Sequence, residues 1–232
     1  MELQKRLLKS LCFDNTHSYL LELDKENELA KVIPKIKDMK LVGECKYHVV
    51  NCFDHSLNAL EEFEDLLKCD NFFQGHLKEH VKQYLNTQVE KDIMVVSILK
   101  LGIFLHDIGK PDCKTIDETG RVHFDGHEKI GAIESRNLGK ILGLQSNTID
   151  LIYKYVRYHM TLLSLYKSND MSQDNLYKIF DKLQDDIIGI LILGYVDIIS
   201  TRKLLNPNED TRVIKTYVDY ILTNYIYRYK RR

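Results

Sequence analysis

Hydrophobic residues follow the helical period along most of this chain. Steps of three and four recur in residues 48–67, 127–142, 147–159 and 171–183, and each segment is predicted to form an amphipathic helix. Shorter apolar runs between residues 2 and 38, interrupted by Pro34, predict two or three further helices. The pattern indicates one helical domain that carries an N-terminal helical extension.

Two segments are apolar on every side and are therefore predicted to be central helices. They span residues 93–105 and 186–205. His106 and Asp107 directly follow the first segment, and Asp197 interrupts the second. Buried imidazole and carboxylate groups are costly unless they are paired, neutralised or bound to metal. A surface position for Asp197 is the alternative, but its helix has little polar face before Arg202.

The composition is that of an ordinary helical, soluble protein. Hydrophobic residues make up 44% and charged residues 29% of the 232 positions, and three prolines with 11 glycines favour helices over a turn-rich β fold. The net charge of -1 gives no general attraction to nucleic acid or to an anionic membrane.

The cysteines and the apolar runs indicate a cytoplasmic location. Five cysteines without a C-x-x-C pair argue against a disulfide framework and a thiolate zinc site. The N-terminus resembles an amphipathic helix rather than a signal peptide. The longest apolar run, residues 187–196, is shorter than the roughly 20 residues that a membrane helix needs. We therefore expect no membrane partner.

Several histidines lie where a buried ligand is expected. His55 falls on the apolar stripe of residues 48–67, although a hydrogen-bonded core histidine explains that position as well. His127 begins one predicted helix, and His159 extends the apolar stripe of the next. His76 and His80 have the spacing of a helical metal pair, but their polar surroundings predict a solvated helix face.

Together these residues form a candidate metal centre: His55, His106, Asp107, His127, His159 and Asp197. A mixed His/Asp set without cysteine suits Fe, Mn, Ni, Mg or Zn. Six ligands could serve one or two divalent metal ions, with Asp107 shared between two. A metal ion makes a bound water more acidic, and a two-metal site suits attack of that water on phosphorus.

The order H…HD…D resembles the HD superfamily of metal-dependent phosphohydrolases. The sequence is closest to the HD domain of the bacterial tRNA nucleotidyltransferase/poly(A) polymerase family. The similar stretches cover most of residues 30–205 and read KYHVVNCFDHSL (46–57), FLHDIGKP (104–111), DETGRVHFDGHEKIGA (117–132), VRYHM (156–160) and YVDIISTR (195–202). The nucleotidyltransferase head of that family has no counterpart in these residues, so we expect a free-standing HD hydrolase.

The resemblance implies an all-α HD-domain bundle with a central metal site. Residues 1–40 would form the N-terminal extension, 41–205 the HD domain, and 206–232 a C-terminal helix with a basic tail. The core ligands of the family match His55, His106, Asp107 and Asp197, and the additional ligands of two-metal members match His127 and His159.

The same resemblance assigns substrate contacts. It implies that Asp107 and Lys110 take part in catalysis and that Lys110 contacts the substrate phosphate. Arg202 and His48 are weaker candidates for the same anionic pocket.

Two functions follow from these features. The first is a metal-dependent phosphohydrolase that acts on a small nucleotide-like phosphate monoester, a cyclic phosphodiester or an RNA end. The second is a non-catalytic module that binds RNA or a nucleotide, or docks a partner, around a structural metal. The tyrosine- and arginine-rich end, residues 227–232, supports the second. A solvated tail whose cations lie at a helix C-terminus accounts for that end better. The physiological substrate, the metal and the oligomeric state stay open.

Overall fold

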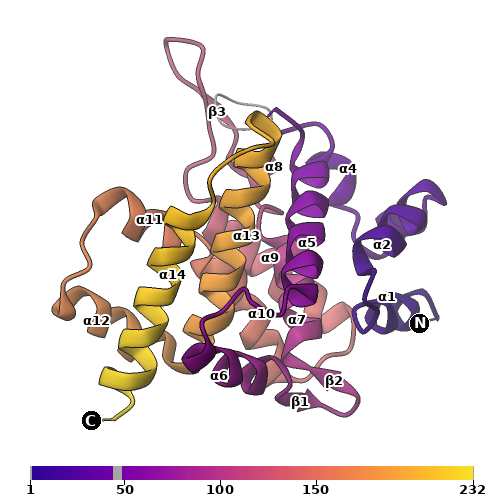
Figure 1. Ribbon diagram of the computed structural model, residues 1–232. Helices are drawn as coiled ribbons and strands as arrows, with labels where there is room; N and C mark the ends of the chain where they lie inside the picture. Colours follow the sequence, from indigo (N-terminus) through magenta and orange to yellow (C-terminus); the bar gives the residue numbers. More distant parts are fainter. Residues whose placement is uncertain (1, 44–48, 232) are drawn as a thin grey trace.

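The computed structural model describes residues 2–43 and 49–231 and places two buried helices at the centre of a helical bundle (Figure 1). They are α7 (Val95–Leu105) and α13 (Ile187–Leu205). Helix α5 (Cys52–Lys68) packs against both of them, and so does α10 (Ser146–Tyr158). The predicted helical bundle and its two central helices are confirmed, because segments without a polar face need neighbours on every side.

The close approach of α10 to both central helices depends on two glycines. A Cβ atom on Gly102 of α7 would lie 2.9 Å from the Cβ of Tyr155, and one on Gly189 of α13 would lie 2.6 Å from its ring. The Tyr155 hydroxyl is 2.7 Å from that of Tyr84, so the one polar atom of this buried ring has a partner. Tyr155 therefore fixes α10 against the centre of the bundle.

The N-terminal extension consists of four helices on one side of the bundle (Figure 1): α1 (Glu2–Ser10), α2 (Thr16–Lys25), α3 (Leu29–Val32) and α4 (Ile36–Met39). Pro34 separates α3 from α4, as the sequence predicts. Lys100 of α7 is buried and donates to the Phe13 carbonyl and, over 3.1 Å, to Thr16 Oγ1. This lysine joins the extension to a central helix.

The other helices cover the remaining sides of the bundle. They are α6 (Gly75–Leu85), α8 (Lys110–Cys113), α9 (His127–Ile141), α11 (Thr161–Ser168), α12 (Gln173–Leu183) and α14 (Arg212–Asn224), with a 3₁₀ turn, η1 (Gln184–Asp186), and a π-helical turn, η2 (Tyr225–Tyr229). The Tyr227 hydroxyl donates to the His76 carbonyl over 2.7 Å, and its ring packs on His76 and His80. The tyrosines of the C-terminal segment are thus packed, and the expectation of a solvated tail is wrong for them.

Short elements account for the other differences from the sequence predictions. Residues 93–94 form strand β2 (Ile93–Met94), which pairs antiparallel with β1 (Gln88–Glu90). The segment 111–126 contains a hairpin of β3 (Thr115–Ile116) and β4 (Val122–His123). Pro111 lies in the first turn of α8, where a missing N–H is harmless.

The start of α5 also differs from the prediction. The helix begins at Cys52, and Asn51 caps it by accepting the Asp54 N–H at 2.9 Å. His48, which we expected in this helix and near the substrate, lies outside the described residues.

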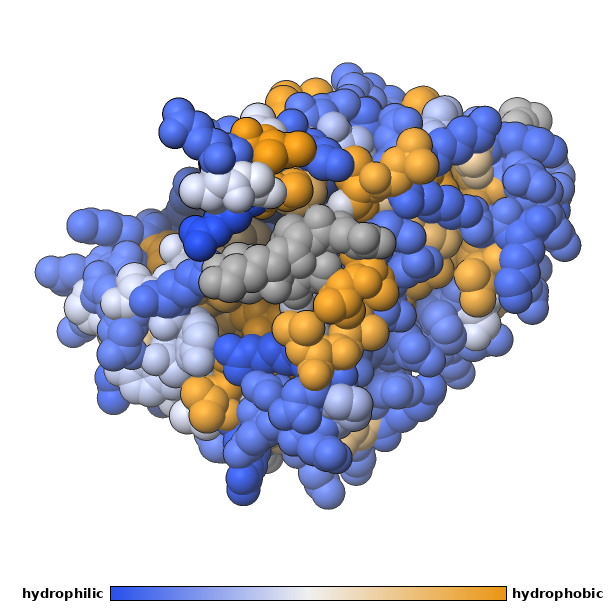
Figure 2. All heavy atoms as spheres, turned by 90° about the horizontal axis from the view of Figure 1, so that it is seen from above, coloured by the Kyte–Doolittle hydropathy of each residue, from blue (hydrophilic) through white to orange (hydrophobic). Residues whose placement is uncertain are grey.

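Hydrophilic side chains cover most of the face seen in Figure 2, with several hydrophobic patches between them. Within residues 2–43 and 49–231, no helix has both the length and the apolarity to cross a bilayer.

Candidate metal centre

Helix ends and one helix interior bring the six predicted ligands together. His106 and Asp107 follow the last residue of α7, His127 is the first residue of α9, and His159 is the C-cap of α10. His55 lies in the first turn of α5, and Asp197 in the middle of α13. Five of the six residues are buried, and the side chain of Asp197 is 13% exposed.

The first group contains His55, His106 and Asp107, whose candidate ligand atoms all lie within 4.8 Å of one another. The Nε2 atoms of His55 and His106 are 3.2 Å apart. Asp197 Oδ1 lies 2.9 Å from His55 Nε2 and 3.5 Å from His106 Nε2. Asp107 Oδ2 lies 3.8 Å and 3.4 Å from the same two nitrogens. The four side chains therefore converge on one point.

The second group contains Asp107, His127 and His159. The Nε2 atoms of His127 and His159 are 3.2 Å apart, and Asp107 Oδ1 is 3.4 Å from His127 Nε2. One carboxylate oxygen of Asp107 thus faces each group. The two groups share this aspartate, as a bridging ligand of two metal ions would be shared.

Main-chain carbonyl groups fix three of the histidine rings. His106, His127 and His159 each place Nδ1 2.7–2.8 Å from the carbonyl oxygen three residues earlier. A carbonyl can only accept, so Nδ1 must carry the proton in each ring. In the neutral form of each ring, Nε2 then carries the free lone pair, which is the form that binds a metal ion.

This arrangement fits a cation. In the second group the two Nε2 atoms face each other across 3.2 Å, and with Nδ1 protonated in both rings this approach is favourable only when a proton or a metal ion lies between them. Two ligand atoms about 2.1 Å from a shared ion, at tetrahedral or octahedral angles, are about 3.0–3.4 Å apart. The Nε2 separations of both groups fall in this range.

The pKa values of the histidines in the site also fit a bound cation. Burial lowers the pKa of His106, but the carboxylates of Asp107 and Asp197 outweigh it and raise the pKa to about 9. Burial and the neighbouring His106 and His127 lower the pKa of His159 to about 3. The first group therefore favours a positive charge, while the second offers a neutral imidazole as ligand.

Lys110 is part of the site. Its Nζ lies 2.6 Å from Asp107 Oδ2, and the residue is 5% exposed. Burial alone raises the pKa of Asp107, yet the Lys110 ammonium and the surrounding histidines hold it well below its usual range. Asp107 is therefore an ionised carboxylate, as a bridging ligand must be, and the Lys110 ammonium lies beside it.

The other described residues that the sequence singled out make contacts of their own or are exposed. Arg202 Nη1 is 3.1 Å from Glu209 Oε1, and its guanidinium lies 5.3 Å from the centre of the Tyr166 ring. His76 and His80 are exposed on α6, as predicted.

Two glycines and one phenylalanine also position the site, and the sequence analysis missed them. A Cβ on Gly109 would lie 2.3 Å from the His127 carbonyl oxygen and 2.5 Å from the Gly131 nitrogen. Phe124 supplies the carbonyl that orients His127, and its ring centre is 5.5 Å from Lys110 Nζ. In the sequence, the glycine between Asp107 and Lys110 was the available signal of a close backbone contact. A helix approaches a neighbouring backbone this closely only at a residue without a side chain.

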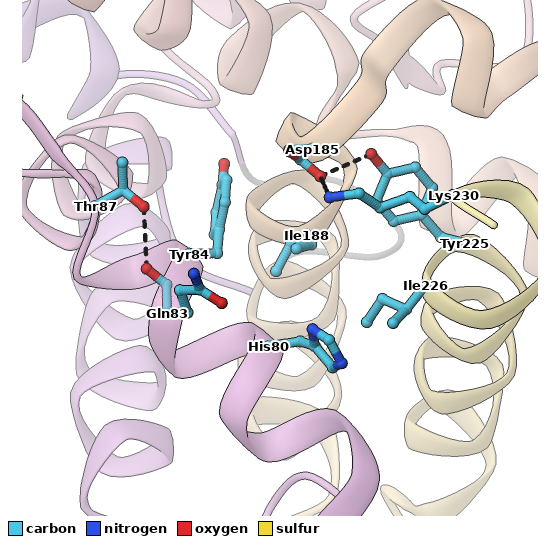
Figure 3. Close-up of a pocket in the computed structure, with 9 residues that line it drawn as sticks. All are labelled: His80, Gln83, Tyr84, Thr87, Asp185, Ile188, Tyr225, Ile226 and Lys230. Carbon is cyan, nitrogen blue, oxygen red and sulfur yellow. Dashed lines mark hydrogen bonds and ion pairs between the residues drawn. The ribbon is translucent and has the colours of Figure 1, made fainter.

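Two surface cavities lie apart from this centre. The first, of about 330 Å³, lies between α6, the start of α13 and the C-terminal turn, and Asp185 there accepts from Tyr225 over 2.8 Å and from Lys230 over 2.6 Å (Figure 3). The second, of about 570 Å³, lies over α9, α10 and α12. None of the six candidate ligands lines either cavity.

The helical bundle and its buried His/Asp cluster define an HD-type domain. Residues 75–186 match the family model of the HD domain, and four of the six candidate ligands lie within that match. His55 and Asp197 lie outside it and reach the cluster through α5 and α13. Among curated proteins, the comparison finds no match.

Proposed function

We propose that this protein is a metal-dependent phosphohydrolase that cleaves the phosphate ester of a nucleotide or of an RNA end. One observation carries the proposal: a buried aspartate, Asp107, is shared by two groups of imidazoles and accompanied by a lysine. Separately, each group resembles a structural ligand set. Joined at Asp107, they have the arrangement suited to holding an attacking water and a phosphoryl group together.

The ligands divide between two positions. His55, His106, Asp107 and Asp197 would hold one divalent ion, and Asp107 with the remaining two histidines would hold a second. Their mixed nitrogen and oxygen donors suit Fe, Mn, Ni, Mg or Zn. Such ions polarise phosphoryl oxygens and make water a better nucleophile near neutral pH.

The protein groups have separate roles in this proposal. Asp107 orients the attacking water, because its two oxygens face the two halves of the site. Lys110 neutralises negative charge that develops on the phosphoryl oxygens, and a positioned cation in a buried site stabilises such charge strongly. Arg202 and His48 are further candidates for contacts with the substrate, and Arg202 would have to leave Glu209 to make one.

The substrate class rests on sequence. The stretches that resemble the tRNA nucleotidyltransferase/poly(A) polymerase family support a nucleotide or an RNA end. A non-catalytic RNA-binding or partner-docking module with a structural metal is the competing function.

Hydrolysis assays with added Mn, Ni, Co, Fe or Mg test the proposal. The substrates are a generic aryl phosphate and 2′,3′-cyclic nucleotides, with metal content measured on protein purified without chelator. Asp107→Ala should abolish turnover and lower metal content while the helical circular dichroism signal stays. Asp65→Ala is the matched control, because Asp65 is 66% exposed on α5 and pairs with Lys68. A wild-type protein that binds metal but hydrolyses none of these substrates would favour the non-catalytic module.

A further inference from the structure

A surface groove that shares helix α10 with the candidate metal centre carries tyrosines and cations together. This is the cavity of about 570 Å³ over α9, α10 and α12. The ring of Tyr153 lies 4.0 Å from the Arg136 guanidinium, and the ring of Tyr158 lies 4.6 Å from Lys182 Nζ. Lys154 lies between the two tyrosines on α10. Aromatic faces combined with lysine and arginine are typical of surfaces that bind single-stranded nucleic acid.

Adjoining side chains connect this groove to the candidate ligands. Tyr158 directly precedes His159 at the end of α10. The Arg157 guanidinium lies 5.3 Å from the Tyr158 ring centre, and its Nη1 is 3.3 Å from Glu128 Oε1. Glu128 follows His127 at the start of α9. A nucleic-acid strand bound in the groove would therefore end next to the second group of candidate ligands.

The charges of the groove leave one cation available. Arg136 pairs with Asp150 over 3.1 Å, and Lys154 pairs with Asp186 over 2.5 Å. Lys182 is exposed and takes part in none of the ion pairs found among residues 2–43 and 49–231. The groove thus carries three cations against two carboxylates. Phosphate contacts should be few, and base stacking should supply most of the affinity.

We propose that this groove binds the last nucleotides of a single-stranded RNA whose terminal phosphate enters the metal centre. The proposal rests on the phosphohydrolase function above and narrows its substrate from a free nucleotide to an RNA end. Tyr153 and Tyr158 stack on unpaired bases, and Lys182 contacts a phosphate between them. From residue 150 to residue 158, α10 rises about 12 Å, which spans about three nucleotides stacked at about 3.4 Å each.

Binding is measured by fluorescence anisotropy with a labelled six-nucleotide RNA whose ends are hydroxyls, so that hydrolysis does not interfere. The single strand should bind and the matching duplex should bind much more weakly, because paired bases cannot stack on tyrosine. Tyr158→Leu should weaken binding about tenfold. Lys182→Ala should lower the slope of log affinity against log salt by about 0.7, the value for one phosphate of a single strand.

Lys178→Ala is the matched control, because Lys178 is exposed on α12 one turn before Lys182. It should leave both affinity and salt slope unchanged. The groove would not be an RNA-binding site if single strand and duplex bound equally. The same conclusion would follow if wild type, Tyr158→Leu and Lys182→Ala had equal affinity.

Hydrolysis separates this proposal from the function on which it rests. Lys182→Ala should keep wild-type turnover of the aryl phosphate and lose kcat/KM on an RNA-end phosphate. If the wild type hydrolyses aryl phosphate but Lys182→Ala also leaves RNA-end hydrolysis unchanged, the groove assignment fails alone. If the wild type hydrolyses neither substrate while the six-nucleotide RNA still binds in the groove, the phosphohydrolase function fails, and with it the RNA end as substrate.

Discussion

Replacement of Gly109 by alanine tests how the chain holds its candidate ligands. The new Cβ would lie 2.3 Å from the His127 carbonyl oxygen and 2.5 Å from the Gly131 nitrogen. Both contacts are about 1 Å too short, and both involve backbone, which cannot turn aside as a flexible side chain can. The short helix α8 would have to move away from α9, and this would separate Asp107 and Lys110 from His127.

The size of the effect follows from overpacking. Insertion of a methyl group into a close-packed contact costs about 1–3 kcal/mol. A loss of about 2 kcal/mol in the free energy of unfolding lowers Tm by about 4–8 °C for a chain of this size. Gly109 has φ of -84°, so the effect comes from the steric contact and not from a left-handed backbone.

Two other glycines calibrate the measurement. A Cβ on Gly131 would meet its nearest neighbours at 3.2 Å, and one on Gly75 would meet nothing within 4 Å. We therefore expect the loss of Tm and of bound metal to be largest for Gly109→Ala, smaller for Gly131→Ala and near zero for Gly75→Ala. Thermal denaturation and metal analysis of the three variants give the order. If Gly109→Ala were as stable as Gly75→Ala and kept its metal, the close contact would not position the site.

Three further predictions concern charge and metal. Removal of metal with a chelator should lower Tm, by about 5–11 °C if the ion is present at about 100 times its dissociation constant, and added metal should restore it; an unchanged Tm would mean that no ion is bound. Lys110→Met should lower kcat about 10²-fold with metal content retained, and a wild-type kcat would remove Lys110 from the mechanism. Burial raises the pKa of Glu64 above 4.5, against the lowering effects of His17 and Lys100. The protonated Glu64 side chain therefore stabilises the fold fully below its unfolded pKa, and this contribution declines as the pH rises through the folded pKa. Urea denaturation should therefore show Glu64→Gln gaining stability relative to wild type as the pH rises from about 4 to 7, and a difference independent of pH would contradict this assignment.

The sequence indicated the candidate ligands because their surroundings are so apolar. His106, Asp107 and Asp197 stand beside or within segments that have no polar face, so a shared partner was the physical explanation for their charges. The separation of 142 residues between His55 and Asp197 was no obstacle, because both lie on helices with a readable period.

The sequence did not predict the shortest elements or the features that depend on contacts between residues distant in sequence. Strands of two or three residues have too few positions to show a period, so both hairpins were missed. The cap at Asn51 had a readable signal in its residue type and was overlooked, since the apolar stripe continued before it. The packing of Gly109 on α9 and of Tyr227 on α6 involves partners distant in sequence, which no local pattern encodes.

The carbonyl groups that hold His106, His127 and His159 have a consequence for how this centre tolerates mutation. Each anchor is an atom of the main chain, so replacement of the side chain at Ile103, Phe124 or Val156 leaves it in place. The orientation of His106 and His159 is instead vulnerable to anything that unwinds the last turn of α7 or α10. Loosening of those two helix ends would release both imidazoles to rotate and so lower the affinity for a metal ion without a change in any candidate ligand.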